Sequence, residues 1–500
     1  MTLAESAFDL LIVGGGINGA GIARDAAGRG LSVLLVEQDD LAAHTSSAST
    51  KLIHGGLRYL EHCEFGLVRK SLAERERLID AAPHIMWPMR FVMPHDAHLR
   101  PAWMIRAGLF LYDHLARRRR LQGSRAVDLR AHAAGAALDP HFRRGFEYSD
   151  GWVDDARLVL LNALDARERS ATILTRTRCE SIRREAGAWR AVLAGADGRR
   201  EVAARALVNA AGPWAAEFVH DRSPLRTRHG VRLVKGSHVV VRRLFDHDYA
   251  YIFQAPDRRI VFALPYERDF TLIGTTDVEY GAAPSAPHID SDEVDYLCTM
   301  ANRYFRLSIT PADVVWTYSG LRPLLEDESA DPSSVTRDYV LELDEDGAPA
   351  LSIFGGKLTT FRVLAEEAVD RLAPRLGSAR GPWTAGVPFP GGDLPEADFG
   401  RFQAAAGDRW PWLPTNLRLR LARAYGSRME RIVGAAAGIA DLGQEVVPGL
   451  HAAEIDYLVH QEWACTAEDI LWRRSKLGLH LGPDAAEVLE AWLAARRAGG

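Results

Sequence analysis

The sequence predicts an α/β fold in which a Rossmann-like dinucleotide-binding domain is interleaved with an antiparallel-sheet substrate domain and followed by an α-helical C-terminal domain. Three observations predict this architecture. A strand, a glycine-rich turn and an Ala-rich helix open the chain, strand-like segments dominate residues 170–360, and apolar residues recur at helical spacing after residue 395. Because 500 residues exceed one ordinary hydrophobic core, we expect several domains.

The opening segment reads as a βαβ unit. Residues 8–13 form an apolar strand, residues 20–29 an Ala-rich helix and residues 31–37 a second strand. The turn before the helix, GGGING at residues 14–19, has the spacing G-x-G-x-x-G. Its first glycine permits a tight turn, its second lets the backbone approach a pyrophosphate, and its third lets the helix pack on the strand. Glu37 can accept hydrogen bonds from an adenosine ribose, so the unit predicts NAD or FAD.

Two further segments favour FAD over NAD. A hydroxyl-rich run, TSSASTK at residues 45–51, can bind phosphate and ribityl oxygens, although such a run is also typical of a solvated surface loop. Residues 354–360, FGGKLTT, combine a strand end, two glycines and a helix start, which is a second anion-binding arrangement far along the chain. Two such sites suit a long cofactor held at both ends. We assign cofactor binding to Gly14, Gly16, Asn18, Gly19, Glu37, Gln38, Thr45, Ser46, Ser47, Ser49, Lys51, His54, Gly55, Ala210, Gly212, Gly355, Gly356, Lys357, Leu358 and Thr359.

The rest of the chain divides into segments of different predicted secondary structure. Residues 50–120 read mostly as helix, with four prolines (positions 83, 88, 94 and 101) as breaks. Strand-like segments dominate residues 170–360, residues 358–376 return to helix, and the Gly/Pro-rich residues 381–395 read as a linker. We place the FAD-binding domain in residues 1–80, 150–220 and 345–380, the substrate domain in residues 81–149 and 221–344, and the helical domain in residues 396–500.

The bulk composition excludes several classes of protein. With 61 basic and 66 acidic residues the net charge is −5, so no global basic excess points to nucleic acid. The four cysteines lie far apart and form no CxxC pair, which argues against a disulfide framework, and no His or acidic cluster has ligand spacing, so we expect no metal. No apolar run reaches 18 residues and the N-terminus has no signal pattern. We expect a cytoplasmic protein, or one on the cytoplasmic face of a membrane.

Several long motifs carry a resemblance to a known family. The N-terminal stretch DLLIVGGGINGAGIARDAAGRG, and later KGSHVVV, IGTTDVEY, VVWTYSGLRPL, FGGKLTTFR and DILWRRSKLGLHL, resemble the bacterial aerobic, membrane-associated glycerol-3-phosphate dehydrogenases. The resemblance covers nearly the whole chain. It implies a flavoprotein fold of the glycine oxidase and D-amino-acid oxidase type, oxidation of sn-glycerol 3-phosphate to dihydroxyacetone phosphate, ubiquinone as electron acceptor and peripheral attachment to the cytoplasmic membrane. A homodimer is one option, and the sequence leaves the oligomeric state open.

The implied substrate requires cations for its phosphate. Arginine suits this task because its planar fork binds two phosphate oxygens at once. The candidates are Arg58, with Tyr59 beside it in HGGLRYL, Arg322 in SGLRPL and Arg337 in TRDY. Each could instead be a surface salt-bridge partner.

The secondary alcohol requires a base. We assign this role to His238 in KGSHVVV, because histidine titrates near neutrality, although a histidine in a strand can equally be a hydrogen-bonded core residue. Lys357 can stabilise a developing oxyanion or the reduced flavin. Thr276 in GTTD can hydrogen-bond the substrate, or it can simply be a turn residue. The predicted catalytic residues are therefore His238, Arg322 and Lys357.

A quinone acceptor would require contact with a bilayer. Residues 103–112 are apolar and Arg117 to Arg120 follow, which suits an anionic interface. The alternative is a core helix whose terminal cations complement its dipole. A second possibility is that Arg473, Arg474 and Lys476 of the C-terminal domain lie on the membrane.

Other functions stay open at this point. The nearest is an oxidase that passes the same electrons to oxygen and makes hydrogen peroxide. An amine oxidase of the same fold, a non-catalytic flavoprotein and an NAD-linked dehydrogenase are more distant alternatives.

Overall fold

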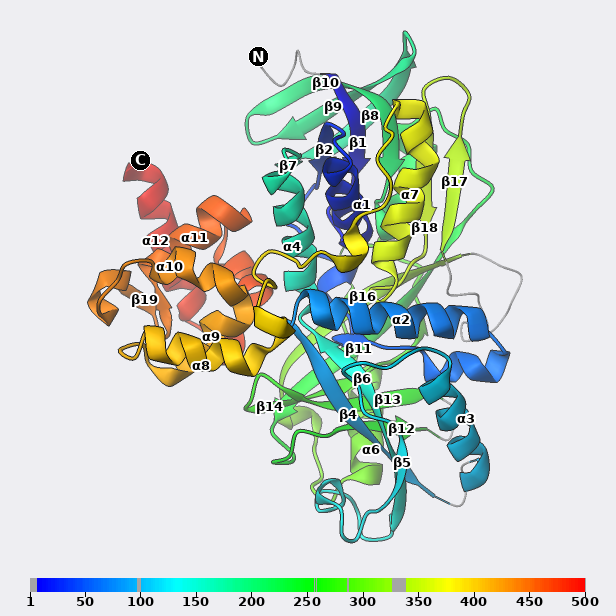
Figure 1. The fold of residues 1–500 in the computed structure, drawn as a ribbon, viewed down its shortest axis with the longest axis vertical. Coiled ribbons are helices and arrows are strands. Elements are labelled where there is room, and N and C mark those ends of the chain that lie inside the picture. Colours follow the sequence, from blue (N-terminus) through cyan, green and yellow to red (C-terminus); the bar gives the residue numbers. More distant parts are fainter. Residues whose placement is uncertain are drawn as a thin grey trace.

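The computed structural model describes residues 7–96, 100–255, 257, 259–285, 287–325 and 339–499. Figure 1 shows a first sheet with its helices in the upper half of the molecule, a second sheet in the lower half, and C-terminal helices to the left. The predicted fold class is therefore confirmed. The chain passes between the two sheets several times, which is why the two domains are interleaved in sequence.

The first sheet has the strand order β17-β18-β10-β1-β2-β7. Its centre is the predicted βαβ unit, since β1 pairs in parallel with β2 and with β10. Residues 10–12 of β1 are at most 1% exposed, as expected for a parallel sheet covered on both faces. The bounds are β1 (Ala7–Val13), β2 (Val33–Val36), β7 (Thr172–Leu174), β8 (Arg178–Glu185), β9 (Ala188–Gly195), β10 (Gly198–Asn209), β17 (Val340–Asp344) and β18 (Ala350–Phe354), with β8 and β9 forming an antiparallel extension of β10.

Three helices share the main core of the first sheet, and α5 (Ala215–Arg222) packs in a second cluster with β8 and β9. Small residues let these helices approach closely. A Cβ added at Gly21 would lie 2.8 Å from the ring of Phe361, so the glycines and alanines of α1 form a smooth contact surface. The three helices are α1 (Ile17–Gly28), α4 (Asp155–Glu168) and α7 (Phe361–Leu376).

The second sheet has the order β15-β11-β14-β13-β12-β4-β6-β3, with β16 paired to β11 and β5 to β6. It is antiparallel except for a short parallel contact between β12 and β4. Helix α6 (Ser291–Tyr304) packs on it and begins with a capping box of Asp290 and Glu293. The bounds are β3 (Leu52–Ile53), β4 (Met86–His95), β5 (Arg125–Asp128), β6 (Arg144–Val153), β11 (Val231–Arg242), β12 (Ala250–Gln254), β13 (Ile260–Tyr266), β14 (Phe270–Gly274), β15 (Val278–Glu279) and β16 (Val314–Leu325).

One stretch differs from the sequence prediction. Residues 50–120 were expected to be mostly helical, yet β4 is a ten-residue strand that contains Pro88 and Pro94. On its β12 side, β4 pairs only at Phe91 and Val92. Pro88 and Pro94 lie outside that short contact, so their missing N–H groups remove few hydrogen bonds from the sheet. The helices of this stretch are α2 (Phe65–Ala81) and α3 (Ala102–His114), together with the 3-10 segment η3 (Leu57–His62).

Residues 381–395, the predicted linker, are fixed to the first domain. The indole of Trp383 donates to the carbonyl of Asp25 at 3.0 Å, and the amide of Phe389 donates to the carbonyl of Ala81 at 2.9 Å. The helical C-terminal domain follows with its own hydrophobic core, as expected. Its elements are α8 (Phe399–Arg409), α9 (Thr415–Tyr425), α10 (Glu430–Val433), β19 (Glu445–Val447), β20 (Leu450–His451), α11 (Ala452–Glu462), the π-helical segment η11 (Asp469–Arg474) and α12 (Ala485–Gly499).

Buried ion pairs join the C-terminal domain to the rest. Asp40, 3% exposed, accepts from Arg473 Nε at 2.7 Å and from Arg474 Nη2 at 2.8 Å, and Lys476 Nζ lies 2.9 Å from Asp154. The idea that Arg473, Arg474 and Lys476 lie on a membrane is therefore wrong. Their charges are neutralised inside the domain contact.

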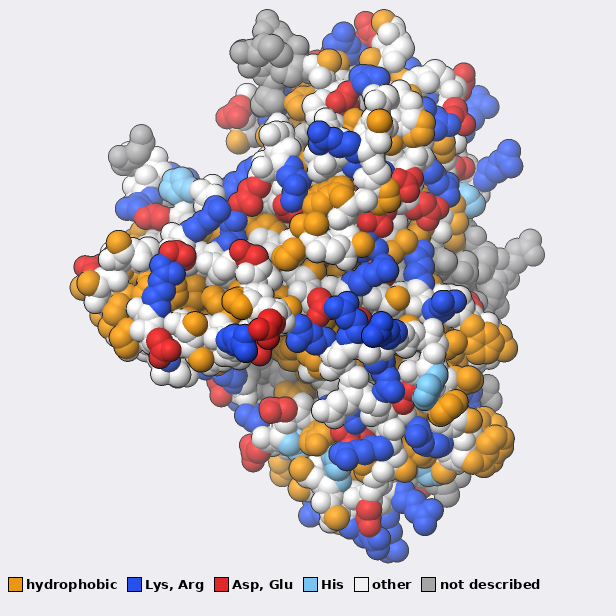
Figure 2. All heavy atoms as spheres, in the orientation of Figure 1, with side chains coloured by type: hydrophobic (Ala, Val, Ile, Leu, Met, Phe, Trp, Pro, Cys, Tyr) orange, Lys and Arg blue, Asp and Glu red, His pale blue; other side chains and the backbone are white. Residues whose placement is uncertain are grey.

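Helix α3 lies on the surface, so the alternative of a core helix is also wrong. Trp103 is 70% exposed, Phe110 53% and Leu111 44%, and these residues follow a helical spacing that places them on one face. Figure 2 shows hydrophobic side chains gathered at the lower right edge of this view, over α3 and the start of α2. Across the described ranges, no helix is both long and apolar enough to cross a bilayer.

Candidate functional site

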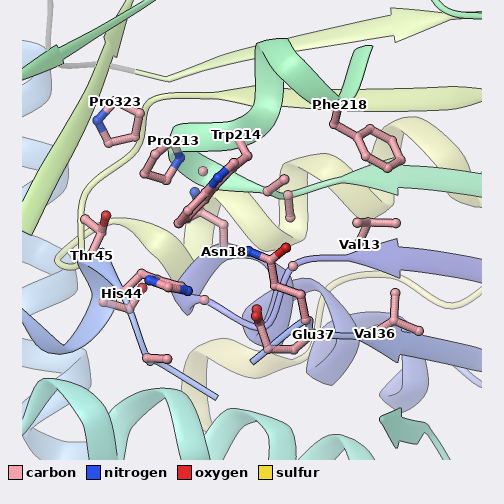
Figure 3. A pocket seen from close by; sticks show the side chains of 18 of the residues that line it. Val13, Asn18, Val36, Glu37, His44, Thr45, Pro213, Trp214, Phe218 and Pro323 are labelled. Atoms are coloured by element: carbon pink, nitrogen blue, oxygen red, sulfur yellow. The ribbon is translucent and has the colours of Figure 1, made fainter. Parts of the chain in front are cut away.

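A pocket lies at the carboxyl ends of β1, β2, β10 and β18, the edge where ligands bind in open α/β sheets. Figure 3 shows Asn18, Glu37 and Trp214 around it, each from a different segment of the chain. The lining includes Gly14, Gly16, Asn18, Glu37, Gln38, Thr45, Ser46, Ala210, Gly212, Gly355 and Gly356. The two glycine turns that are far apart in sequence therefore meet at one pocket.

The glycines of the first turn are required by close approach. Gly14 has φ of 113°, and a Cβ there would lie 2.4 Å from the carbonyl oxygen of Ala210. A Cβ at Gly19 would lie 1.9 Å from the carbonyl oxygen of Gly14. Neither position can carry a side chain without moving the backbone. Gly19 thus acts in helix packing, as its place in the motif predicts.

Polar contacts tie the pocket walls together. Ser46 Oγ accepts from the amide of Ile17 at the start of α1 at 3.0 Å, and Asn18 Nδ2 donates to the carbonyl of Gly355 at 3.2 Å. Asn18 Oδ1 is buried without a hydrogen-bond partner among the described residues. These contacts bring a helix N-terminus, a hydroxyl and a second glycine turn to one place, which suits an anionic group.

Glu37 lies at the end of β2 with its carboxylate in the pocket. Oε2 accepts from the amide of Gly15 at 2.6 Å and Oε1 from the amide of Asp39 at 2.9 Å. Burial raises the pKa of the Glu37 carboxyl, while the two amides oppose this rise. Each carboxylate oxygen has a second lone pair, so the group can still accept from a ribose hydroxyl.

Some residues of the hydroxyl-rich run do not face this pocket. Lys51 Nζ lies 2.8 Å from both carboxylate oxygens of Asp155, and Ser49 Oγ donates to the same carboxylate at 2.7 Å. Lys51 is only 1% exposed. These two side chains fix the loop to the start of α4, so we correct their assignment from cofactor ligands to residues that hold the loop. Ser47 lines a neighbouring cavity instead.

The segment after the run joins the second glycine turn. The amide of His54 donates to Thr359 Oγ1 at 3.2 Å, and the amide of Gly55 donates to the hydroxyl of Tyr112 at 2.7 Å. The Nζ of Lys357 lies 3.9 Å from the ring centroid of Tyr59. His54 and Tyr59 thus contact Thr359 and Lys357, and Leu358 packs against the cluster that contains Ile53, but none of these residues lines the pocket itself.

His238 lies on β11, on a face of the second sheet that meets the loop at 45–50. Its Nε2 lies 2.9 Å from Thr50 Oγ1, its ring stacks on Tyr318 at 4.6 Å, and its Nδ1 finds no partner in the described part of the chain. A Cβ at Gly274 would lie 2.1 Å from the ring, so this glycine makes the necessary space. Burial, and then the positive charges of Arg322 and Lys51, hold the pKa of His238 well below its usual range. The ring is neutral at pH 7.

Arg322 lies on β16 close to the same face. Its Nη2 donates to Thr275 Oγ1 at 3.0 Å and its Nη1 pairs with Asp277. A Cβ at Gly236 would lie 2.4 Å from Nη2, so a second glycine leaves room for this guanidinium. The strands β11 and β16 are paired, and the guanidinium of Arg322 reaches Gly236, which is two residues from His238 on β11.

Thr276 is turned away from this cluster. Its hydroxyl donates to Glu293 of α6 at 2.6 Å and accepts from the amide of Ser237 at 2.8 Å, and the residue is 1% exposed. The adjacent Thr275 points to Arg322 instead. The Thr276 hydroxyl is therefore already engaged, which contradicts its predicted hydrogen bond to a substrate. The two threonines lie in the irregular segment between β14 and β15, where the sequence alone does not fix the direction of each side chain.

Of the other two candidate phosphate ligands, the structure describes Arg58 but not Arg337. Arg58 is half-buried in η3 and has no ion pair or hydrogen bond with another residue that the structure describes. Arg337 lies outside the described residues.

One set of potential metal ligands occurs among the residues described. The side chains of Glu37, Asp39 and His44 lie within 4.8 Å of one another. His44 Nε2 already lies 2.8 Å from Asp39, and Glu37 accepts from two amides. We assign no metal to this turn.

Comparison with known proteins gives the family. Residues 9–362 match the model of FAD dependent oxidoreductases, and residues 383–495 match the C-terminal domain of alpha-glycerophosphate oxidase. A glycerol-3-phosphate dehydrogenase from Pseudomonas aeruginosa is 54% identical over 98% of this chain and 96% of its own length. This chain belongs to the FAD-dependent glycerol-3-phosphate dehydrogenase family.

A second sequence relative and a solved structure are also similar to this chain. A D-erythritol 1-phosphate dehydrogenase from Brucella abortus is 51% identical, with 97% of each chain covered. The crystal structure of a glycerol-3-phosphate dehydrogenase from Bacillus halodurans, complexed with FAD, has a TM-score of 0.80 and 29% identity, and covers 99% of this chain and 91% of that chain.

The residues of the pocket fit FAD. The N-terminus of α1 and Ser46 suit the pyrophosphate of FAD, and Glu37 suits its adenosine ribose. The buried Asn18 Oδ1, which has no partner among the described residues, can accept a hydrogen bond from the cofactor. His44, Trp214, Phe218 and Pro323 also line the pocket, and sequence reasoning missed them. His44 and Trp214 adjoin the predicted residues Thr45 and Gly212, whereas no nearby motif identifies Phe218 of α5 or Pro323 of β16.

Proposed function

We propose that this protein oxidises the C2 hydroxyl of sn-glycerol 3-phosphate to dihydroxyacetone phosphate. The observation that carries the proposal is the pair formed by a buried, neutral His238 and the guanidinium of Arg322, close together beside the loop that lines the FAD pocket. A base and a cation are what a phosphorylated secondary alcohol requires. The relative from Pseudomonas aeruginosa, named a glycerol-3-phosphate dehydrogenase, supports the same substrate.

Arg58 and Arg322 are the proposed phosphate ligands. Arg58 has no ion pair within the described chain, so its fork is available for two phosphate oxygens. Arg322 keeps Asp277 as a partner, which orients its guanidinium and leaves part of it for the substrate. Arg337 stays a proposed contributor from outside the described residues.

His238 is the proposed base. Thr50 holds one ring nitrogen and the other has no described partner, so a substrate hydroxyl that reaches the ring meets a neutral proton acceptor. Bound FAD supplies the acceptor for the C2 hydride. Lys357, beside Tyr59, supplies the positive charge that a developing oxyanion or a reduced cofactor requires.

A second candidate substrate is D-erythritol 1-phosphate. The relative from Brucella abortus that carries this name is 51% identical, close to the value for the glycerol-3-phosphate dehydrogenase. Both substrates present a phosphate and a secondary alcohol. The same arginines and the same base would serve either one.

An anaerobic titration tests the proposal. The FAD-loaded protein is mixed with sn-glycerol 3-phosphate, D-erythritol 1-phosphate or glycerol, and the visible flavin band is recorded. We expect bleaching by the first compound at lower concentration than by the second, and none by glycerol. Preferential bleaching by D-erythritol 1-phosphate would favour the second candidate, and no bleaching by either phosphate would remove both.

For the electron acceptor we propose a membrane quinone, reached by peripheral attachment to the inner face of the cell membrane. The exposed face of α3 carries Trp103, Met104, Phe110 and Leu111, and exposed arginines of the segment 117–120 follow it. An apolar helical face next to basic residues suits an anionic lipid surface. Reoxidation by oxygen with release of hydrogen peroxide is the alternative, and a direct comparison of quinone and oxygen as acceptors separates the two.

A further inference from the structure

His238, the proposed base, has a polar partner at only one of its two ring nitrogens. Its Nε2 lies 2.9 Å from the hydroxyl oxygen of Thr50, and its Nδ1 is buried with no partner among the described residues. The residue is 2% exposed, and its ring lies against that of Tyr318 with the two planes 14° apart. Because a neutral imidazole carries one proton, one ring nitrogen is a donor and the other an acceptor. The position of that proton decides which nitrogen can receive another from a substrate.

The surroundings of the ring favour a proton on Nε2. Thr50 Oγ1 can accept that N–H, and because Thr50 is only half-buried, its own hydroxyl proton is not forced to point at the ring. The opposite tautomer would leave an N–H at Nδ1 buried without an acceptor among the described residues, which is costly. With the proton on Nε2, Nδ1 presents a lone pair instead, and a lone pair is what a substrate hydroxyl requires of a base.

Thr50 is held in place through the residues on either side of it. Asp155, 0% exposed, accepts from Ser49 Oγ at 2.7 Å and from Lys51 Nζ at 2.8 Å. The hydroxyl of Tyr318 donates to the carbonyl of Ser49 at 2.8 Å, and Lys51 Nζ lies 4.9 Å from the centroid of the same ring. The loop is thus fixed to the ring that stacks on the base, which leaves the Thr50 hydroxyl little freedom to move away from Nε2.

We propose that Thr50 is a positioning residue, which accepts the Nε2–H of His238 and thereby keeps Nδ1 unprotonated as the acceptor for the substrate proton. The inference rests on the proposed function. In the step that Thr50 serves, the proton of the C2 hydroxyl moves to Nδ1, and the C2–H bond breaks with its electron pair going to bound FAD as a hydride. The ring becomes an imidazolium that keeps its Nε2–H bonded to Thr50, and C2 becomes a ketone.

Anaerobic single-turnover reduction of the FAD-loaded protein by sn-glycerol 3-phosphate tests this role. Thr50→Val keeps the shape of the side chain but removes the hydroxyl. We expect its limiting rate to fall about 3- to 10-fold, with no change in the substrate concentration that gives half of that rate. Thr50→Ser keeps a hydroxyl and should react within about 2-fold of the unmodified protein. An unchanged rate in Thr50→Val, or a serine variant as slow as the valine variant, would overturn the proposal.

Thr227→Val is the matched control. Thr227 is also half-buried, and its hydroxyl donates to Glu342 at 2.5 Å, but it does not line the FAD pocket. This variant should be reduced at the unmodified rate, and a loss as large as that of Thr50→Val would count against a specific role for Thr50.

The affinity for FAD is a second readout, which does not depend on turnover. Titration of apoprotein with FAD, followed by the change in flavin fluorescence, should give the same affinity for Thr50→Val and the unmodified protein. A loss of FAD affinity as large as the loss of rate would assign the hydroxyl to the cofactor pocket and contradict the proposal.

The tautomer itself can be observed by nitrogen NMR of histidine-labelled, FAD-loaded protein. The spectra distinguish a protonated ring nitrogen from an unprotonated one, and the signals that are missing in His238→Gln belong to His238. We expect the proton on Nε2 in the unmodified protein and a mixture of tautomers in Thr50→Val. A proton on Nδ1 in the unmodified protein would rule the proposal out.

A double-mutant cycle separates this role from the assignment of the base. Once His238→Gln has removed the ring, adding Thr50→Val should cost nothing further, whereas the same fold loss in both backgrounds would show that Thr50 does not act through the ring. An unchanged rate in His238→Gln alone would reject the base. A slow His238→Gln beside a fully active Thr50→Val would keep the base and reject only the role of Thr50.

Discussion

Two basic clusters that look alike in the sequence have opposite positions in the molecule. Arg117 to Arg120 follow the apolar residues of α3, and Arg473 and Arg474 follow the apolar residues Ile470 to Trp472. In each cluster one aspartate pairs with two arginines. Asp40 is buried with Arg473 and Arg474, whereas Asp80 pairs at the surface with Arg119, which is 62% exposed, and with Arg120.

The difference lies in what the cluster is packed against. The aspartates Asp40 and Asp154 come from the FAD-binding part of the chain, so they neutralise Arg473, Arg474 and Lys476 inside a domain contact. The arginines after α3 stay near an exposed apolar face instead. A basic run beside an apolar segment thus predicts a membrane surface only when no distant carboxylates are placed to bury it.

The largest effect is expected from removing the buried ion pairs of Asp40 with Arg473 and Arg474. Asp40→Asn keeps the shape but leaves Arg474 buried without a carboxylate partner, so we expect the free energy of unfolding to fall by about 3–5 kcal/mol. Asp80→Asn is the matched control, and its loss should stay within about 1 kcal/mol because the pairs are exposed. Denaturant unfolding of both variants measures the difference. Equal losses would mean that burial does not distinguish the two clusters.

The sequence predicts the local elements of the fold but not the long-range partners of the buried charges. The glycine turn, Glu37 and the helical C-terminal domain follow from local patterns, and the structure has them as predicted. The partner of Arg474 is more than 400 positions away, at Asp40, and no local pattern links them. Likewise Lys51 and Ser49 belong to a hydroxyl-rich run, but Asp155 engages both.

Substitutions on the exposed face of α3 should change membrane binding and leave the free energy of unfolding unchanged. Burying the Phe110 ring in lipid is worth about 1.5–3 kcal/mol, so Phe110→Glu should weaken binding to anionic vesicles about 10- to 100-fold. Val488→Glu in α12 replaces another exposed apolar residue, on the opposite side of Figure 1, and should bind as the unmodified protein does. Vesicle co-sedimentation measures both. Retained binding of Phe110→Glu would remove α3 from the membrane surface.

A smaller effect is expected from the basic residues themselves. Each exposed arginine near an anionic surface is worth about 1 kcal/mol, so Arg117→Ala should weaken vesicle binding about 5-fold at low salt. The effect should shrink as salt is raised, because exposed charges are screened. Arg496→Ala in α12 is the control. The same loss in Arg117→Ala at low and high salt would show that its charge is not what contacts the lipid.

The proposed catalytic residues show a second limit of sequence reasoning. His238 and Arg322 are identified by residue type and motif, and the structure brings them together on neighbouring strands with Gly236 and Gly274 making the space. Thr275 contacts Arg322 whereas Thr276 contacts Glu293, although the two residues are neighbours in the segment between β14 and β15. The path of this irregular segment sets the direction of each hydroxyl, and no local sequence pattern predicts that path.

The central claim is that His238 accepts the substrate proton, and single-turnover flavin reduction tests it most directly. FAD-loaded protein and His238→Gln are mixed anaerobically with sn-glycerol 3-phosphate at several pH values. Because the neutral ring is the acceptor and its pKa is lowered, the rate should stay high as pH falls through 6.5 and decline only below it. We predict that His238→Gln reduces the rate about 10²- to 10⁴-fold with little change in substrate affinity. An unchanged rate in the variant would contradict the account.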